Sequence, residues 1–228
     1  MRKHHWVYDP FVCLYLPLRE LDGASFMSRD HYGHLCTVAG ARWTPEGYSY
    51  DKVDDVITIP DHVAVQNIFD SPGGSLVAWV KANSDGEGDN GTIYQKVNVQ
   101  NLLVTNEAPG YVKINFTHAF SGTVGNWITT NAVMKLEKSN LIVVTYDNSN
   151  VANVPTIYLN GNPVALTITT APVGTRTSDV GGAVAIGNRA DTSRTWDGII
   201  HEIRARRGKM LALAEIADIY LADDWRLV

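Results

Sequence analysis

The 228-residue sequence contains only two cysteines and no long hydrophobic run. No stretch approaches the roughly eighteen apolar residues that span a bilayer, so we expect no membrane insertion. The basic N-terminus is followed by Asp9, Pro10 and Pro17 instead of the apolar core of a signal peptide, and we expect cytoplasmic synthesis. Cys13 and Cys36 lie in apolar, strand-like surroundings, which favours two buried, reduced thiols over a disulfide framework.

Blocks of like charge are also missing. The formal net charge is −5, and 19% of the residues are charged. Because binding to phosphate depends on clustered Lys and Arg, we expect no nucleic-acid partner. One short basic run alternates with Ile203 and Ala205, and we interpret it as the solvated side and end of a strand; it consists of Arg204, Arg206, Arg207 and Lys209.

The chain consists largely of short runs rich in Val, Ile, Thr and Tyr, separated by clusters of Gly, Asn, Asp and Pro. This pattern is typical of an antiparallel β-sandwich, and 228 residues suit one large all-β domain, residues 1–228. The predicted strands are residues 12–16, 35–38, 56–59, 76–81, 91–96, 101–105, 112–116, 141–146, 156–159, 164–169, 183–186 and 198–206.

Two local features of the sequence give more specific predictions. Asn160-Gly161 supplies the positive backbone dihedrals of a tight hairpin, which predicts that residues 156–159 pair with residues 164–168. A single helix is predicted over residues 210–221, because Leu213, Ile216 and Tyr220 recur on one face at the helical period. We expect this helix to lie against the sandwich, with Trp225 docked on it.

Six motifs in order carry a family resemblance: residues 14–18 with Tyr32-Gly33-His34, then 54–60, 76–81, 141–147, 158–161 and 196–204. They resemble the concanavalin A-like superfamily, and within it the laminin-G-like, pentraxin-related domains of bacteria and phages. The resemblance implies a jelly roll of two antiparallel sheets with one short C-terminal helix. This fold carries lectins, glycosidases, lyases and structural modules, so function must be sought in sites.

Catalytic patterns are not apparent. The glycosidases of the superfamily place carboxylates at alternate positions of one strand, so that acid and nucleophile face the sugar together. The nearest approach here is Asp51 with Asp54 and Asp55, which precede a strand as a turn would. Motifs of serine hydrolases, zinc sites and phosphate loops are missing as well. We therefore predict a protein that is not an enzyme.

A structural calcium ion is a further expectation that the resemblance raises. The family's last-strand carboxylate position is His201 here, and its early-loop position is Ser28, with Asp30 nearby. Imidazole and hydroxyl groups replace the hard anionic oxygens that calcium prefers, which favours a chain without calcium. The remaining candidate ligands for a cation are Asp85, Glu87 and Asp89, in a loop that we otherwise interpret as a solvated hairpin tip.

Aromatic residues supply the candidate ligand site, since sugars stack on exposed rings. Trp79 and Trp196 fall within strands and are predicted to pack in the core. Trp43, Tyr111 and Trp127 border turns, where they are candidates for a binding rim; core or edge packing is the alternative for each.

Two functions remain open. The first is a non-catalytic module that recognises a glycan or cell-surface polymer through loops or one sheet face, as an attachment or decoration protein of a phage particle. The second is a structural virion protein whose sandwich edges contact other virion subunits or a second copy of itself, without binding sugar. A polysaccharide-degrading enzyme of the same fold is the least favoured alternative.

Overall fold

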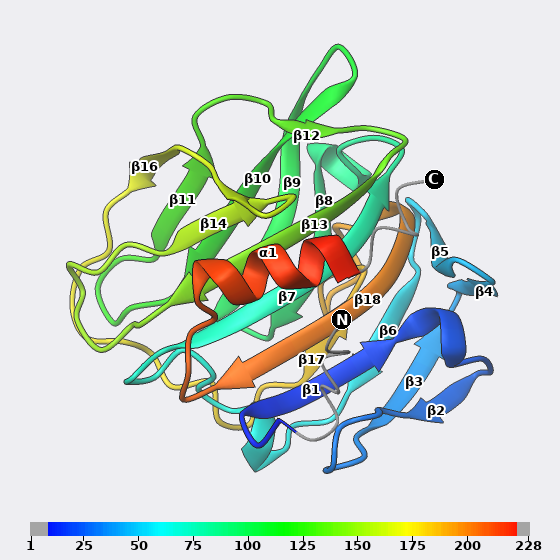
Figure 1. Cartoon of the computed structure of the whole chain (residues 1–228), viewed down its shortest axis with the longest axis horizontal. Helices are drawn as coiled ribbons and strands as arrows, with labels where there is room; N and C mark the ends of the chain where they lie inside the picture. The colour runs from blue at the N-terminus through cyan, green and yellow to red at the C-terminus, as the bar shows by residue number, and fades with distance from the viewer. Residues whose placement is uncertain (1–8, 223–228) are drawn as a thin grey trace.

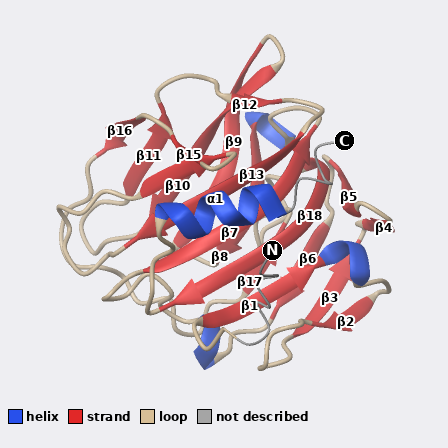
Figure 2. Ribbon diagram, in the orientation of Figure 1, coloured by secondary structure: helices blue, strands red, loops and turns tan. Residues whose placement is uncertain are grey.

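The computed structural model describes residues 9–222, which form two antiparallel sheets packed face to face (Figures 1 and 2). The predicted all-β sandwich is therefore confirmed. One sheet has eight strands: β1 (Val12–Pro17), β4 (Arg42–Thr44), β5 (Gly47–Asp51), β7 (Gly74–Ala82), β13 (Ser139–Tyr146), β14 (Thr156–Leu159), β15 (Asn162–Pro163) and β18 (Asp197–Arg207).

The second sheet has ten strands: β2 (Ser25–Met27), β3 (Leu35–Ala39), β6 (Val56–Ile59), β8 (Asn90–Lys96), β9 (Gln100–Ala108), β10 (Tyr111–His118), β11 (Gly125–Thr129), β12 (Met134–Lys135), β16 (Leu166–Thr170) and β17 (Val184–Ile186). Between residues 9 and 222, three short 3-10 helices lie in the connections: η2 (Leu18–Glu20), η3 (Val63–Val65) and η4 (Glu87–Asp89). Within the described residues the single α-helix is α1 (Leu213–Ala222), which begins three residues later than predicted. Trp225 lies outside the described residues.

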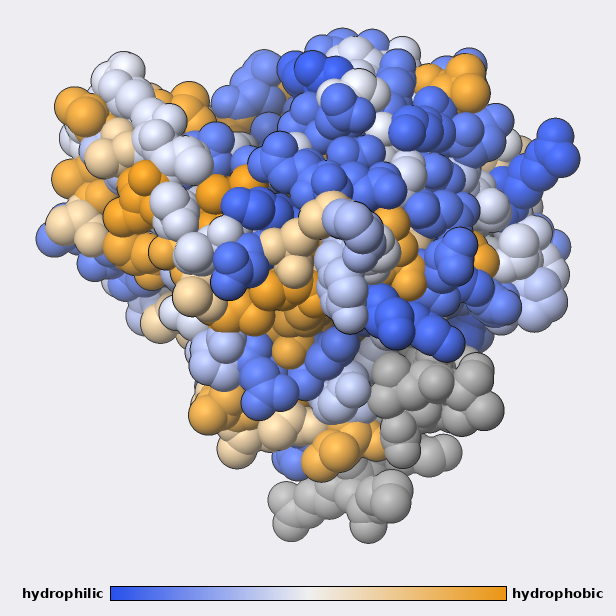
Figure 3. All heavy atoms as spheres, turned by 90° about the horizontal axis from the view of Figure 1, so that it is seen from above, coloured by the Kyte–Doolittle hydropathy of each residue, from blue (hydrophilic) through white to orange (hydrophobic). Residues whose placement is uncertain are grey.

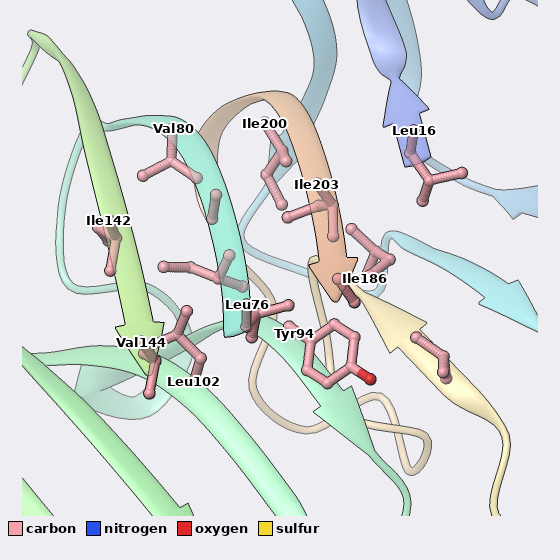
Figure 4. Packing of buried hydrophobic residues seen from close by; sticks show 14 of the residues in the cluster. Leu16, Leu76, Val80, Tyr94, Leu102, Ile142, Val144, Ile186, Ile200 and Ile203 are labelled. Carbon is pink, nitrogen blue, oxygen red and sulfur yellow. The ribbon is translucent and has the colours of Figure 1, made fainter. Parts of the chain in front are cut away.

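The main core fills the space between the sheets. Alternate residues of β13, such as Ile142 and Val144, point inward toward Tyr94 and Leu102 of the other sheet (Figure 4). Burying each such side chain stabilises the fold by about 1.5 to 3 kcal/mol. Trp79 does not join this core, although it is as fully buried as predicted.

A second apolar layer lies on the outer face of the eight-stranded sheet. Helix α1 crosses the middle of this face in Figure 1. Its Ile216 and Ile219 pack with Trp79, Leu141 and Val143, which point away from the main core. Strands β7 and β13 are therefore buried on both faces, which explains why their sequences are nearly continuous hydrophobic runs.

The predicted hairpin at Asn160-Gly161 is correct at its turn and for the residues next to the turn, but not beyond Val164. Both residues have positive φ, 50° and 85°. Strand β14 pairs with the two residues of β15, and then the chain crosses over so that β16 pairs with β11 in the other sheet. The backbone N–H of Val164 donates to the carbonyl oxygen of Ile157 at 2.9 Å, so the pairing extends one residue beyond β15. Ile168 of β16 then lies opposite Trp127 instead of β14.

The prediction for the basic run that begins on β18 is correct for Arg207 and Lys209, which are exposed, and wrong for the other two residues. Arg204 and Arg206 are buried rather than solvated. The Arg206 guanidinium pairs with Asp9 at 2.8 Å and with Glu215 of α1 at 3.1 Å. Arg204 pairs with Glu202 and lies over the ring of Tyr15. These cations are therefore engaged within the protein and do not form a basic surface.

Cys13 and Cys36 are both free thiols in the interior. Burial raises the pKa of each to about 12, so neither is a reactive thiolate near neutral pH. Among the helices of residues 9–222, none has the length and hydrophobicity that a membrane crossing requires.

Candidate functional site

An open pocket of about 360 Å³ lies where the edges of the two sheets approach each other. Strand β4 ends the eight-stranded sheet, and β2 and β3 end the ten-stranded sheet. We call it the Trp43 pocket; it is lined by Asp22, Gly23, Ala24, Val38, Gly40, Ala41, Trp43 and Tyr48.

Trp43 forms one wall of the pocket and is 38% exposed. It lies opposite Tyr48 in the β4–β5 pair, and its indole N–H donates a hydrogen bond to the carbonyl oxygen of Arg19 at 3.2 Å. The ring is therefore held in place while part of it remains accessible. A large ring fixed before a ligand arrives loses little conformational entropy on binding.

Tyr48 closes the pocket from the core side. Its hydroxyl donates to the carbonyl oxygen of Gly23 at 2.9 Å, which ties strand β5 to the loop before β2. Burial, assisted by the nearby Asp22 carboxylate, raises the pKa of Tyr48 to about 12. Tyr48 thus stays protonated near neutral pH, while Asp22 is exposed to solvent and offers acceptor oxygens at the rim.

Gly40 also lines the pocket. It has a φ of +75°, and a Cβ at this position would lie 2.0 Å from the Oδ1 atom of Asp55. A glycine is required here because both the backbone conformation and the space exclude a side chain. At Gly40 itself, the pocket is consequently lined by main-chain atoms.

The three aromatic residues predicted to form a binding rim lie in different environments. Trp43 lies in the pocket. Tyr111 is 40% exposed, but it begins strand β10 in the ten-stranded sheet, opposite Ala108 and Lys135, and does not line the pocket.

Trp127 does not form a binding rim, and this prediction is wrong. It is fully buried between the sheets, with its ring 6.2 Å from Phe116 and 5.5 Å from Tyr146. Successive side chains of β11 point to opposite faces of the sheet, and Trp127 takes an inward position in the core, whereas the adjacent Asn126 is partly exposed.

The predicted cation ligands do not converge, and this prediction is also wrong. The Asp85 carboxylate is buried and accepts a hydrogen bond from the backbone N–H of Glu107 at 3.2 Å. Glu87 accepts from the backbone N–H and the hydroxyl of Thr195 at 2.9 and 3.1 Å. Asp89 is exposed. Two of the three carboxylates therefore fasten the loop to its neighbours.

Carboxylates gather instead before β6. The oxygens of Asp51, Asp54 and Asp55 lie within 4.8 Å of one another, the only such group of potential metal ligands in residues 9–222. Asp55 accepts from the backbone N–H of Asp51 at 2.9 Å, and Asp51 accepts from that of Val53 at 3.1 Å. Burial raises the pKa of Asp55. These bonds hold the turn that leads into β6, as the sequence predicts.

The positions implied by family resemblance for calcium are engaged elsewhere. His201 is buried, with Nδ1 2.6 Å from the carbonyl oxygen of Glu46 and Nε2 3.1 Å from the Ser139 hydroxyl. Ser28 accepts from the backbone N–H of His34 at 2.7 Å. Asp30 accepts from the backbone N–H groups of Tyr15 and Tyr32, both at 3.0 Å.

The other pocket residues were not predicted from the sequence because three separate segments supply them. Asp22 and Gly23 precede β2, Gly40 follows β3, and Tyr48 lies in β5. Their convergence depends on the sheet edges, which no local motif reveals. The Gly40-Ala41 turn just before Trp43 was the one available signal.

A family model matches residues 51–217, more than two thirds of the chain, and it describes the concanavalin A-like lectin/glucanases superfamily. The chain belongs to this superfamily. A comparison with curated proteins finds no match. The matched residues of this concanavalin A-like protein contain strands of both sheets, but they begin after β1–β4 and therefore after Trp43.

Solved structures agree on the fold. Domain 4 of the extracellular arabinanase AbnA from Geobacillus stearothermophilus, solved with arabinotriose, is 14% identical with a TM-score of 0.63; the match covers 92% of this chain and 98% of that domain. The binding domain of botulinum neurotoxin serotype D/C is 13% identical with a TM-score of 0.67, covering 93% of this chain and 52% of that domain.

The sialidase of Trypanosoma rangeli is 16% identical with a TM-score of 0.63. Here the match covers 96% of this chain but only 34% of the sialidase. The chain therefore corresponds to about half of the neurotoxin domain and a third of the sialidase. At these identities the likeness concerns the fold.

Proposed function

We propose that this concanavalin A-like protein is a non-catalytic recognition module that binds a glycan or cell-surface polymer in the Trp43 pocket. The observation that carries the proposal is the fixed, partly exposed indole of Trp43 beside a carboxylate and two glycines. The pocket's volume of about 360 Å³ lies in the range of small-ligand sites.

The chemistry of the pocket suits a saccharide. One face of a sugar ring is covered with C–H groups and packs against an aromatic ring, while its hydroxyls need donors and acceptors at the periphery. Asp22 supplies acceptor oxygens, and the main chain around Gly23 and Gly40 supplies further polar groups. Because the pocket is open, each site would bind weakly, and avidity would come from several copies acting together.

Two structural neighbours support this ligand class. The arabinanase domain was solved with arabinotriose, and the neurotoxin binding domain was also solved in complex with a molecule named SialylT. A role on a virus or phage particle stays a prediction, which mass spectrometry of purified particles would test.

The experiment is a glycan array followed by titration calorimetry with the best hit. The Trp43→Ala variant should lose affinity at least about tenfold, the scale of a central aromatic contact. Tyr111→Ala is the matched control, because Tyr111 is equally exposed but belongs to the other sheet, and it should bind like the wild type.

Two results would contradict the proposal. If Tyr111→Ala loses glycan affinity and Trp43→Ala does not, the binding site lies on the ten-stranded sheet. Release of new reducing ends from an array polysaccharide would show an enzyme. Repeating the array with a chelator tests the cation dependence separately.

A further inference from the structure

Two long segments of the chain carry no Asp, Glu, Lys or Arg. Residues 114–134 and residues 148–175 are both free of these side chains, in a protein in which 19% of the residues are charged. The 37 residues of 19–55, which build the Trp43 pocket, contain eleven of them. Charge is therefore distributed very unevenly along the chain.

The two uncharged segments meet in space at one end of the sandwich. Strand β11 of the first pairs with β16 of the second, and a bridge joins Thr123 to Val173. We call this region the uncharged end, defined by residues 114–134 and 148–175. It lies on the left of Figures 1 and 3, where orange and pale residues predominate, whereas saturated blue residues gather towards the right of Figure 3.

Both sheets terminate at the uncharged end. The outermost strands are β15 in the eight-stranded sheet and β16 in the ten-stranded sheet. Four of the five residues of β16 are exposed, and Ile168 at its centre is 49% exposed. Close to this edge, the neighbouring Val124 and Val173 are 47% and 56% exposed. An edge strand of this kind presents unpaired backbone groups beside apolar side chains.

Natural proteins usually protect such edges with charged residues, proline or very short strands. The opposite edges follow this rule: β2 and β4 have three residues each, and Arg42 lies on β4. Strand β16 has the sequence Leu-Thr-Ile-Thr-Thr, with neither charge nor proline. Depletion of charge is also what distinguishes the centre of protein interfaces from other surfaces.

We propose that two copies of this chain associate through β16, edge to edge and antiparallel, about a two-fold axis near Ile168. A second copy fits this edge for two reasons. The complement of an antiparallel edge strand is the same strand rotated by two-fold symmetry, so one surface serves both partners. Each copy has a net charge of −5, and the uncharged end is the surface where the two repel each other least.

The dimer would leave both Trp43 pockets free, because the pocket is built at the opposite edges of the sheets. Two pockets held by one rigid assembly bind a repetitive polymer with higher avidity than one. The inference does not depend on sugar binding, however, since it concerns only the oligomeric state.

Analytical ultracentrifugation of the full chain over a concentration series tests the proposal. The wild type should sediment as a reversible dimer. Ile168→Lys places two like charges near the axis and should raise the dissociation constant at least about tenfold. Val180→Lys is the control, because Val180 is a 62% exposed valine outside the uncharged end, and it should dimerise like the wild type.

Two further measurements locate the interface without a substitution. Amide hydrogen exchange of residues 166–170 should slow as the protein concentration rises. Raising the salt from about 0.1 M to about 1 M shortens the Debye length from about 10 Å to about 3 Å and should not weaken the dimer, because no ion pair holds it.

A wild type that remains monomeric at every concentration would overturn the proposal. So would an Ile168→Lys variant that keeps the wild-type circular dichroism spectrum and the wild-type dissociation constant, because the copies would then meet elsewhere. If Ile168→Lys unfolds, the exchange experiment decides: protection of residues 166–170 that is independent of concentration contradicts an interface at β16.

Discussion

The two ends of the sandwich use the same strand pairing but differ in charge, edge length and depth of packing. At the end built from residues 19–55, charged loops surround short edge strands, and an aromatic residue, Trp43, remains 38% exposed. At the uncharged end, the aromatic residue Trp127 is fully buried, and the longer edge strand β16 is exposed. The end with polar loops thus has an open pocket, whereas the uncharged end has an exposed edge strand.

This difference shows that exposure cannot be assigned from residue type. Trp43 and Trp127 both border turns in the sequence, yet one lines a pocket and the other fills the core. What separates them is the position of their strands: β4 ends a sheet, whereas β11 has a neighbour on each side.

Trp127→Ala should lower the free energy of unfolding by about 3 to 5 kcal/mol, because it leaves a large cavity between Phe116 and Tyr146. Trp43→Ala removes a half-exposed ring and should cost about 1 kcal/mol or less. Urea denaturation monitored by circular dichroism measures both. Equal losses in the two variants would show that the ends are packed alike.

The fold was largely predictable because strand periodicity and motif order act over short distances. All twelve predicted strand regions contain strands of the structure. The strands that were missed are short or begin with glycine, and they depend on pairing with neighbouring strands: β2, β4, β5, β11, β12 and β15. The course of the chain after Pro163 was not predicted either. It depends on the pairing of β16 with β11, which joins residues about forty positions apart.

A second prediction concerns His118, which lies at the uncharged end against Phe69, Phe120 and Tyr146. Burial lowers its pKa from 6.5 to about 4. Between these values the unfolded chain binds more protons than the folded one, so stability is complete above about pH 6.5 and falls as the pH drops towards 4. The loss from this residue should be roughly 2 to 3 kcal/mol.

His118→Gln should abolish that part of the pH dependence, since an amide does not titrate and can replace the hydrogen bonds to Ala119 and Asn148. The measurement is the free energy of unfolding at several pH values. His31→Gln changes an exposed histidine and serves as the control. If His118→Gln retains the wild-type slope between pH 6.5 and 4, the slope comes from other groups.

The site was less predictable than the fold. Aromatic residues near turns are recognisable in a sequence, and Trp43, one such candidate, lines the pocket; its role in binding stays a prediction. The carboxylates of Asp85 and Glu87 were assigned the wrong role, because a sequence shows their spacing but not their partners, the backbone of Glu107 and the hydroxyl of Thr195. Polar groups of a loop often satisfy the loop itself, and only coordinates show which remain free.

The smallest expected effect concerns Asp22 at the rim of the Trp43 pocket. Asp22→Asn removes one exposed charge, so the free energy of unfolding should change by no more than about 0.5 kcal/mol. Tyr48 should remain protonated at neutral pH, because burial is the main cause of its raised pKa. Glycan affinity should fall by about 1 kcal/mol, close to fivefold, through loss of a charged acceptor.

Glu20→Gln is the control for this variant, since Glu20 is exposed and pairs with Arg19 outside the pocket lining. Calorimetric titration with the array's best glycan compares the two. A drop in affinity confined to Asp22→Asn indicates direct contact with the ligand. An equal drop in both variants would mean that net charge, rather than the pocket, governs binding, and the functional distinction between the two ends of the sandwich would then fail.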